Sequence, residues 1–448
     1  MIAQTKEVHM RLFVLALLGL ALIGLQLSAV QTPNVELFEG ARLITGDGTA
    51  PVENSAFLVE NNRISRVGRR GQVQAPASAI HVDLTGKTVM PAIVDAHSHP
   101  GYTVVRTNRT EKETYTKENL IDHMRRLAYY GIAATMSLGV DRGDIPFQVR
   151  ANPTPGAALL FTAGPGIALP LMGPGAGYRR DAALGFTSEA EARKVVQDLA
   201  AKKVDIVKFW VDDRNGTVKK LPPNLYKVLI DEAHKHNLRA IAHIYYLDDA
   251  KELMRSGIDG FAHGVRDRDI DDEFMAQLKQ RRVFFTPNLP DRPIQADDIP
   301  LIAETLPANQ VQQLRNEIAN RKPGDGAEAI RLFAIQARNL KKINDAHVAT
   351  IGLGTDSGTS IGWPVHTELA DMVEAGMTPN EVITAATKTS AEIVRAGQLG
   401  TIAPGKSADF VVLDANPLEN IKNTRRISKV YIRGKALDRD AMRKEFTQ

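Results

Sequence analysis

Residues 90–100 read M-P-A-I-V-D-A-H-S-H-P. The apolar residues up to Val94 predict a buried strand, and the polar cluster after them contains His97 and His99. Side chains two residues apart on a strand point to the same face, so both imidazoles can reach one point in space. Neutral imidazole is a favoured ligand of zinc and its first-row neighbours. Two ordinary loop histidines explain an isolated H-x-H equally well, so the metal hypothesis depends on ligands elsewhere.

The middle of the chain alternates between strand and helix patterns. Helices are predicted between the strands, for example at residues 116–130, at 188–202 with Ser188 as its N-cap, and at 327–346. The predicted strands are 90–94, 133–138, 158–161, 204–210, 239–243, 260–263, 283–286 and 350–356. Eight strands separated by helices indicate an α/β fold of the parallel (β/α)8 TIM-barrel type. In that fold the active site lies at the carboxyl ends of the strands.

Short β-type segments flank this middle part on both sides. They occur in residues 31–89 and again in residues 399–448. We therefore expect a small composite β-sandwich domain built from both ends of the chain. The catalytic barrel is predicted to occupy residues 90–398.

The carboxyl ends of the predicted strands contain an unusual set of side chains. Beyond the first strand, the ends of four others supply Lys208, His243, His263 and Asp356. By chance we would expect Thr, Ser, Gly and Asp at these positions, and the three remaining strands do end in such residues. The histidines of D-E-A-H-K-H-N, His234 and His236, lie at a helix end instead, where solvation or capping explains them.

Lys208 requires a separate explanation, because a metal repels a protonated lysine. An unprotonated amine reacts with carbon dioxide to form an anionic carbamate, and burial between Val207 and Phe209 favours the unprotonated form. A structural ion pair with Asp205, Asp212 or Asp213 is the alternative. Beside four histidines and an aspartate, the carbamate interpretation is preferred.

The N-terminus has the pattern of an export signal. Arg11 precedes the apolar run 12–27, and small residues follow it, so residues 1–30 are predicted to be a secretory signal peptide. An uncleaved membrane anchor is the competing interpretation. We expect an exported protein, periplasmic or secreted, with no stable membrane partner once the signal is removed. The chain contains no cysteine, which excludes disulfides and thiolate metal sites. A net charge of only +4 does not indicate nucleic-acid binding.

These motifs resemble the amidohydrolase superfamily of metal-dependent hydrolases over nearly the whole chain after residue 30. The resemblance rests on P-A-I-V-D-A-H-S-H, Lys208, A-H-I-Y-Y, F-A-H-G-V and G-T-D-S-G, and on the tail from Gly400 to Asp414. The imidazolonepropionase-like and Xaa-Pro dipeptidase-like branch is the most similar. Two departures are Ala92 in place of the usual glycine and W-V-D-D-R-N-G where relatives have a glycine-rich segment.

The resemblance implies a binuclear centre with two divalent ions, most simply zinc. It assigns His97, His99 and Asp356 to one ion and His243 and His263 to the other. Lys208, carbamylated by CO2, would bridge them, and a shared hydroxide would attack the substrate. Asp356 would also be the catalytic residue that transfers the proton to the leaving group.

Two residues are candidate substrate contacts. Tyr245 completes an H-x-Y pattern that in dipeptidase-like relatives helps to bind a substrate carboxylate, and Arg266 follows His263. A surface tyrosine and an ion-paired arginine are the alternatives. The glycine-rich segment 164–177 is expected to be either a lid or an insertion.

Together these observations predict an enzyme that hydrolyses the amide bond of a small molecule, such as a dipeptide or an N-acyl amino acid. An esterase, a lactonase or a deaminase on the same barrel is the alternative among enzymes. A non-catalytic binding protein is the alternative from another class, although all six predicted ligands are present. A homo-oligomer is compatible with the sequence.

Overall fold

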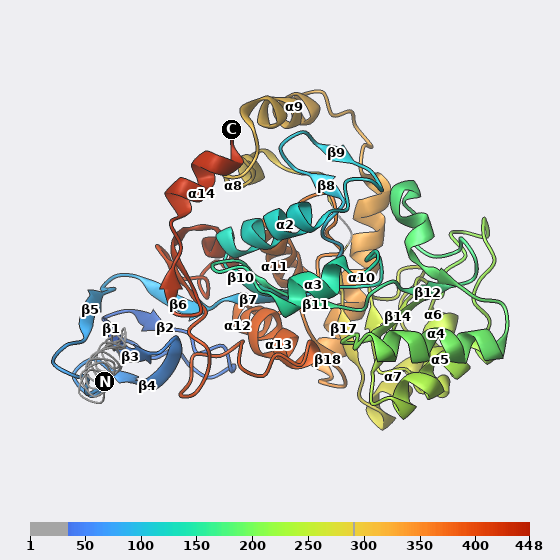
Figure 1. Cartoon of the computed structure of the whole chain (residues 1–448), viewed down its shortest axis with the longest axis horizontal. Helices are drawn as coiled ribbons and strands as arrows, with labels where there is room; N and C mark the ends of the chain where they lie inside the picture. The colour runs from blue at the N-terminus through green and yellow to red at the C-terminus, as the bar shows by residue number, and fades with distance from the viewer. Residues whose placement is uncertain (1–34, 290–291) are drawn as a thin grey trace, which may run out of the picture.

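The computed structural model describes residues 35–289 and 292–448 (Figure 1). The predicted signal peptide, residues 1–30, lies outside the described residues. Within the described part of the chain, no helix combines the length and apolarity that a membrane crossing requires.

Parallel strands form the centre of the molecule in two sheets. One has the order β11-β10-β7, and the other has the order β13-β12-β14-β15-β16-β17-β18. The strands are β7 (Ile93–Ser98), β10 (Ile132–Ser137), β11 (Leu159–Thr162), β12 (Ile167–Ala168), β13 (Leu184–Gly185), β14 (Val207–Trp210), β15 (Ala240–His243), β16 (Gly260–Ala262), β17 (Phe284–Thr286) and β18 (Thr350–Ile351). The fold is therefore α/β, as predicted.

Backbone hydrogen bonds connect the two sheets at both margins. The amide of Ala96 in β7 donates to the Leu353 carbonyl at 2.9 Å, and the amide of Asp205, just before β14, donates to the carbonyl of Thr162 in β11 at 2.9 Å. These bonds join β7 to the segment after β18, and β11 to the segment before β14.

The first predicted strand, 90–94, is divided between β6 (Thr88–Pro91) and β7, and two further differences from the prediction lie near the site. The last strand ends at Ile351 rather than at Asp356, because the backbone leaves the extended conformation and Asp356 has a φ of +53°. In addition, β12 from the glycine-rich segment pairs with β14, so this segment extends a sheet.

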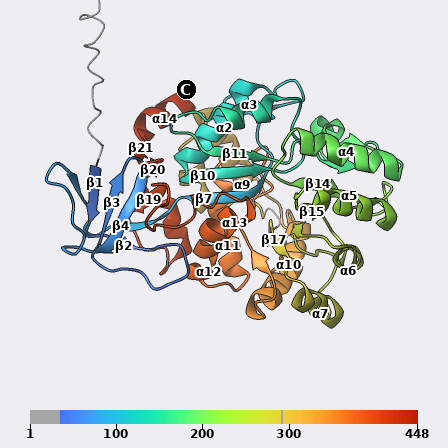
Figure 2. The ribbon, with the colours of Figure 1, turned by 60° about the horizontal axis from the view of Figure 1, so that its bottom comes forward.

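Helices lie between the strands and cover them, with α4 to α7 on the side of the molecule opposite the N-terminal sheet (Figures 1 and 2). Thr116 caps α2, and Ser188 forms the predicted N-cap of α4 in a capping box with Glu191. The helices are α2 (Lys117–Tyr129), α3 (Ile145–Ala151), α4 (Glu189–Ala201), α5 (Pro223–Lys235), α6 (Leu247–Ser256), α7 (Asp272–Gln280), α8 (Ile299–Ile302), α9 (Ala308–Ala319), α10 (Ala327–Asp345), α11 (Pro364–Glu374), α12 (Pro379–Thr384), α13 (Ser390–Ile393) and α14 (Arg439–Phe446).

Residues from the two ends of the chain form two further sheets. One sheet has the order β4-β3-β1-β5, and the other, β2-β6-β19-β20-β21, combines strands from the two ends. The strands are β1 (Val35–Glu39), β2 (Arg42–Leu43), β3 (Ser55–Glu60), β4 (Arg63–Arg69), β5 (Ile80–Asp83), β6 (Thr88–Pro91), β19 (Phe410–Leu413), β20 (Ile427–Ile432) and β21 (Lys435–Ala436). Phe38, Phe57, Phe410 and Tyr431 from the two sheets pack in one aromatic cluster. The predicted domain boundaries, 31–89, 90–398 and 399–448, stay predictions.

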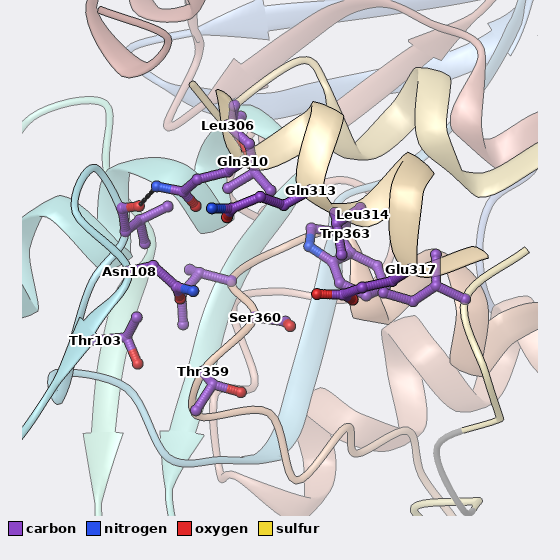
Figure 3. Close-up of a pocket in the computed structure, with 14 residues that line it drawn as sticks. Thr103, Asn108, Leu306, Gln310, Gln313, Leu314, Glu317, Thr359, Ser360 and Trp363 are labelled. Carbon is purple, nitrogen blue, oxygen red and sulfur yellow. Dashed lines mark hydrogen bonds between the residues drawn. The ribbon is translucent and has the colours of Figure 1, made fainter. Parts of the chain in front are cut away.

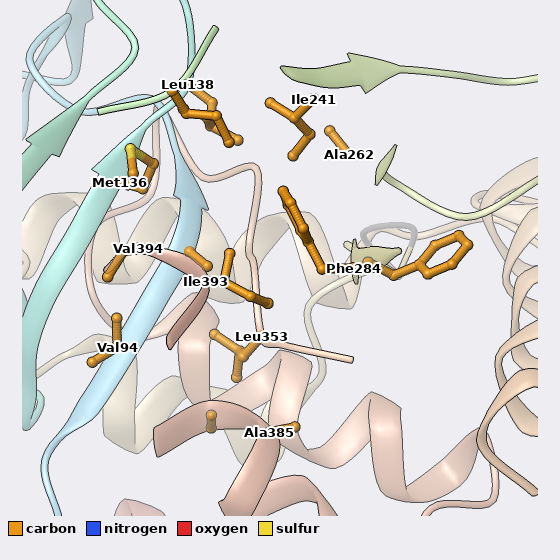
Figure 4. Packing of buried hydrophobic residues seen from close by; sticks show 14 of the residues in the cluster. Val94, Met136, Leu138, Ile241, Ala262, Phe284, Leu353, Ala385, Ile393 and Val394 are labelled. Atoms are coloured by element: carbon orange, nitrogen blue, oxygen red, sulfur yellow. The ribbon is translucent and has the colours of Figure 1, made fainter. Parts of the chain in front are cut away.

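The main core lies among the central strands and the helices that follow β18 (Figure 4). Val94, Met136 and Ile241 come from strands, and Ile393 and Val394 come from the end of the helical segment α13 and the residue after it. Burial of such side chains contributes about 25 cal/mol per Å² of apolar surface. This packing holds the central strands in place.

Candidate metal centre

Three predicted ligands from opposite ends of the chain come together at the end of β7. His97 lies in β7, His99 follows its last residue, and Asp356 lies in the loop after β18. One ligand atom from each lies within 4.8 Å of the other two. Nε2 of His99 is 2.7 Å from Oδ1 of Asp356, and Nε2 of His97 is 3.4 Å from the same oxygen. This spacing is suitable for three ligands of one ion.

Two further histidines continue the cluster. His243 is the last residue of β15 and His263 follows β16, and their ring centroids are 4.6 Å apart. The His263 ring is also 5.1 Å from the His97 ring, and its Nε2 is 3.9 Å from Oδ2 of Asp356. The four imidazoles therefore form one continuous group around Asp356.

The nitrogens of this group fit a metal. Nε2 of His97, Nδ1 of His99 and Nδ1 of His263 are buried and have no hydrogen-bond partner among the described residues. Burial lowers the pKa of His99 to about 4 and holds the pKa of His97 and His263 well below its ordinary value. Neutral buried imidazoles with unpaired nitrogens are the form that binds a divalent ion.

Lys208 lies on β14 beside this group and is 1% exposed. Burial lowers the pKa of its amine to about 7, and the charge of Asp356 opposes that shift. Gly139 leaves room for the side chain of Lys208, because a Cβ at this position, where φ is +88°, would lie 2.8 Å from Cγ of Lys208. The unprotonated amine that carbamylation requires is therefore available near neutral pH.

Asp356 and His263 both have backbone conformations that non-glycine residues rarely adopt, with φ values of +53° and +75°. Such conformations persist where surrounding contacts determine them. The Asp356 amide donates to the His97 carbonyl at 2.8 Å, and the hydroxyl of Thr355 donates to the buried Asp95 at 2.7 Å. Asp356 is thereby attached directly to the H-x-H strand.

Two side chains orient the histidines. Nδ1 of His97 is 2.8 Å from Oδ1 of Asn288, and because that oxygen only accepts, Nδ1 donates and Nε2 keeps its lone pair. Nε2 of His243 is 3.3 Å from Oδ2 of Asp212. Burial acts against ionisation of Asp212, but the bond from His243 lowers its pKa to about 2.

A cavity of about 360 Å³ opens over the centre. Its walls include His99, His243 and Asp356 together with both predicted substrate contacts, Tyr245 and Arg266. The guanidinium carbon of Arg266 lies 5.1 Å from the centre of the Tyr245 ring. One Nη of Arg266 donates to the Ile244 carbonyl at 3.0 Å, whereas its buried Nε has no partner among the described residues.

Sequence reasoning did not find three residues of this site. Asn288 lies just after β17, and the sequence shows no histidine or carboxylate at the end of that strand. Only its position after a central strand could have indicated that it belongs to the site. Asp212 was noted only as an alternative partner of Lys208, and Arg179 lies in the 3-10 helix after the glycine-rich segment. Arg179 and residues Gly173 to Ala176 line the cavity, so this segment does border the site.

The architecture and this ligand set define a metal-dependent hydrolase. The amidohydrolase family model matches residues 88–437, and the chain belongs to that family. Ochratoxinase from Aspergillus niger is 25% identical over 90% of this chain and 86% of that enzyme. The 5-methylthioadenosine/S-adenosylhomocysteine deaminase of Halalkalibacterium halodurans is 24% identical over 84% of both chains.

Solved structures share the fold. Phenylurea hydrolase B superposes with a TM-score of 0.74 at 21% identity, covering 91% of this chain and 97% of its own. A Xaa-Pro dipeptidase with bound methionine superposes with a TM-score of 0.71 at 20% identity, and the match covers 90% of this chain and 99% of the dipeptidase chain. The family match makes the protein a hydrolase of C–N bonds that acts on a small-molecule substrate.

Proposed function

We propose that the protein hydrolyses the amide bond of an N-acyl amino acid or dipeptide whose amino-acid part has a free carboxylate. The observation behind this proposal is the single cavity in which Tyr245 and Arg266 lie beside His243 and Asp356. Arg266 has an unpaired, buried Nε, and a carboxylate is the anion that a guanidinium binds best.

The geometry described above supports the following assignment of metal-binding residues. His97, His99 and Asp356 would bind one divalent ion, and His243 and His263 a second, with carbamylated Lys208 between them. Bound ions of this kind polarise a carbonyl and lower the pKa of water toward neutrality. Zinc is the ion that this nitrogen-rich ligand set suits best.

Asp356 is the proposed acid–base residue. Burial by itself would raise the pKa of its carboxyl, but His263 and His99 hold that pKa well below its ordinary value. The carboxylate is therefore ionised at neutral pH and accepts a proton during the attack on the amide. It then transfers this proton to the leaving nitrogen, which departs as a neutral amine.

Three further parts of the proposal concern the whole chain. The hydrogen bonds between β7 and the segment after β18, and between β11 and β14, support one closed eight-stranded barrel. The apolar run 12–27 supports export by a cleaved signal peptide. Esters and lactones remain alternative substrates, because the same centre activates their carbonyls.

The test compares acids with their amides. Zinc-loaded protein, incubated with bicarbonate, is assayed with dipeptides and N-acyl amino acids and with the same compounds carrying a terminal carboxamide. We expect hydrolysis of the acids, with Arg266→Met raising their KM about tenfold or more because a charged hydrogen bond is lost. Arg255→Met on the exposed surface of α6 is the control. The proposal is wrong if no amide is cleaved while an ester or lactone is.

A further inference from the structure

A second set of hollows begins on the other side of Asp356. A cavity of about 310 Å³ shares Asp356 and Arg179 with the cavity that contains Tyr245 and Arg266. A third hollow of about 120 Å³ shares Ile294 and Trp363 with the second. The shared residues make the three hollows neighbours, and Asp356 lies in the wall common to the cavity of Tyr245 and Arg266 and the first part of this side groove.

The side groove has a defined wall on each side (Figure 3). Helix α9 supplies Leu314, and the hairpin of β8 (Thr103–Val104) and β9 (Arg109–Thr110) lies opposite it. The amide of Gln310 in α9 donates to the Val105 carbonyl at 2.8 Å and so connects the two walls. Thr359, Ser360 and Trp363 lie in the loop that follows Asp356 and line the groove between these walls.

The loop between Asp356 and Trp363 is attached to the metal centre. The His99 amide donates to the Ser357 carbonyl at 2.7 Å, and the Thr103 hydroxyl donates to the Gly358 carbonyl at 3.2 Å. At Gly362, φ is +88° and a Cβ would lie 2.3 Å from Cδ2 of Tyr130, so only glycine allows the chain to turn here. The position of Trp363 is therefore determined relative to Asp356.

The groove offers apolar surface and hydroxyls, and Arg179 and Glu317 add one charge of each sign to its walls. Arg292 pairs with Glu374 at 2.7 Å and with Asp371, and Asp298 pairs with Arg425 at 2.8 Å. The neutral surfaces available to a ligand are the Trp363 indole, the side chains of Ile294, Leu306 and Leu314, and the hydroxyls of Thr359 and Ser360. An indole face packs best against a flat apolar group.

We propose that this groove binds the acyl half of the substrate and selects a bulky aromatic acyl group. The inference rests on the proposed function, because binding of the carboxylate at Tyr245 and Arg266 directs the other half of the substrate across Asp356. Cavities of about 300 Å³ and more are typical of sites that enclose a drug-sized ligand rather than a methyl group. The preferred substrate class is therefore the N-aroyl amino acids.

The first experiment compares N-acetyl-L-phenylalanine with N-(1-naphthoyl)-L-phenylalanine, which share the amino acid and the carboxylate. We expect Trp363→Leu to lower kcat/KM about tenfold for the naphthoyl compound, and Leu314→Ala about threefold, because each removes apolar contact. Neither variant should change kcat/KM for the acetyl compound by more than about twofold. Ile330→Ala, which truncates an exposed aliphatic side chain on α10, should change neither.

The second experiment measures binding without catalysis. Trp210 and Trp363 are the two tryptophans of the chain, so Trp210→Phe leaves Trp363 as the single indole fluorophore. We expect 1-naphthoate, the acid product of the aromatic substrate, to quench this fluorescence saturably, whereas acetate should not. Leu314→Ala in the same background should weaken the quenching.

The outcomes separate the two proposals. If the wild-type protein cleaves both compounds and the groove variants affect both equally, or affect neither, the groove inference is overturned and the hydrolase stands. If 1-naphthoate does not quench Trp363, the inference is likewise overturned. If neither compound is cleaved while 1-naphthoate does quench Trp363, the proposed function is wrong and the aromatic binding site stands.

Discussion

Replacing Lys208 by methionine tests both the chemistry and the energetics of the centre. Methionine keeps a long side chain in the space beside Gly139 but removes the amine. The shift of the Lys208 pKa from 10.5 to about 7 corresponds to about 5 kcal/mol that favours the neutral amine over the charged one. In metal-free protein without bicarbonate, Lys208→Met should therefore be more stable than the wild type at pH 6.

The sign of the pH dependence follows from linkage. Between pH 7 and 10.5 the unfolded state binds a proton that the folded state has released, so wild-type stability rises with pH in this window. The stability advantage of Lys208→Met should thus decrease by about 1.4 kcal/mol per pH unit across it. Urea unfolding of both proteins at pH 6, 8 and 9.5 measures this difference directly.

The same variant should lose function when metal is supplied. Without the carbamate, zinc-loaded Lys208→Met should bind at least one ion fewer by elemental analysis and should have no measurable amidase activity. Full activity with the full metal content would refute the bridging role of Lys208. A stability difference that does not depend on pH would refute the assignment of a buried, largely neutral amine.

Two predictions concern the residues that orient the histidines. Asn288→Ala removes the 2.8 Å hydrogen bond to Nδ1 of His97 and should weaken metal binding about 10–100-fold, as measured by competition with a chelator; unchanged affinity would contradict the orienting role. Asp212→Asn should weaken binding of one ion about tenfold and leave the other unaffected, because Asp212 faces only His243 among the ligands; equal loss at both sites would contradict this. His234→Ala, at the end of α5, is the control for both measurements and should change neither.

Local sequence patterns were sufficient for much of the fold. The H-x-H segment follows a run of buried residues, and the predicted N-cap Ser188 lies where the structure has it. The helix predicted from residue 116 begins directly after Thr116, which caps it. These features depend on side-chain alternation and on local hydrogen bonds, which neighbouring residues determine. The local pattern did not predict where the last strand ends, because contacts with β7 determine the conformation of Asp356.

The sequence by itself determined which chemical groups lie in or after the central strands: four histidines, a lysine and an aspartate with metal-binding chemistry. The tertiary structure alone decided which atoms meet. Asn288 faces His97 across 191 residues of sequence, and Asp212 faces His243. The groove of Leu314 and Trp363 likewise exists only where α9 packs against the segment after β8. Long-range packing produces such contacts, and no spacing within a single element encodes them.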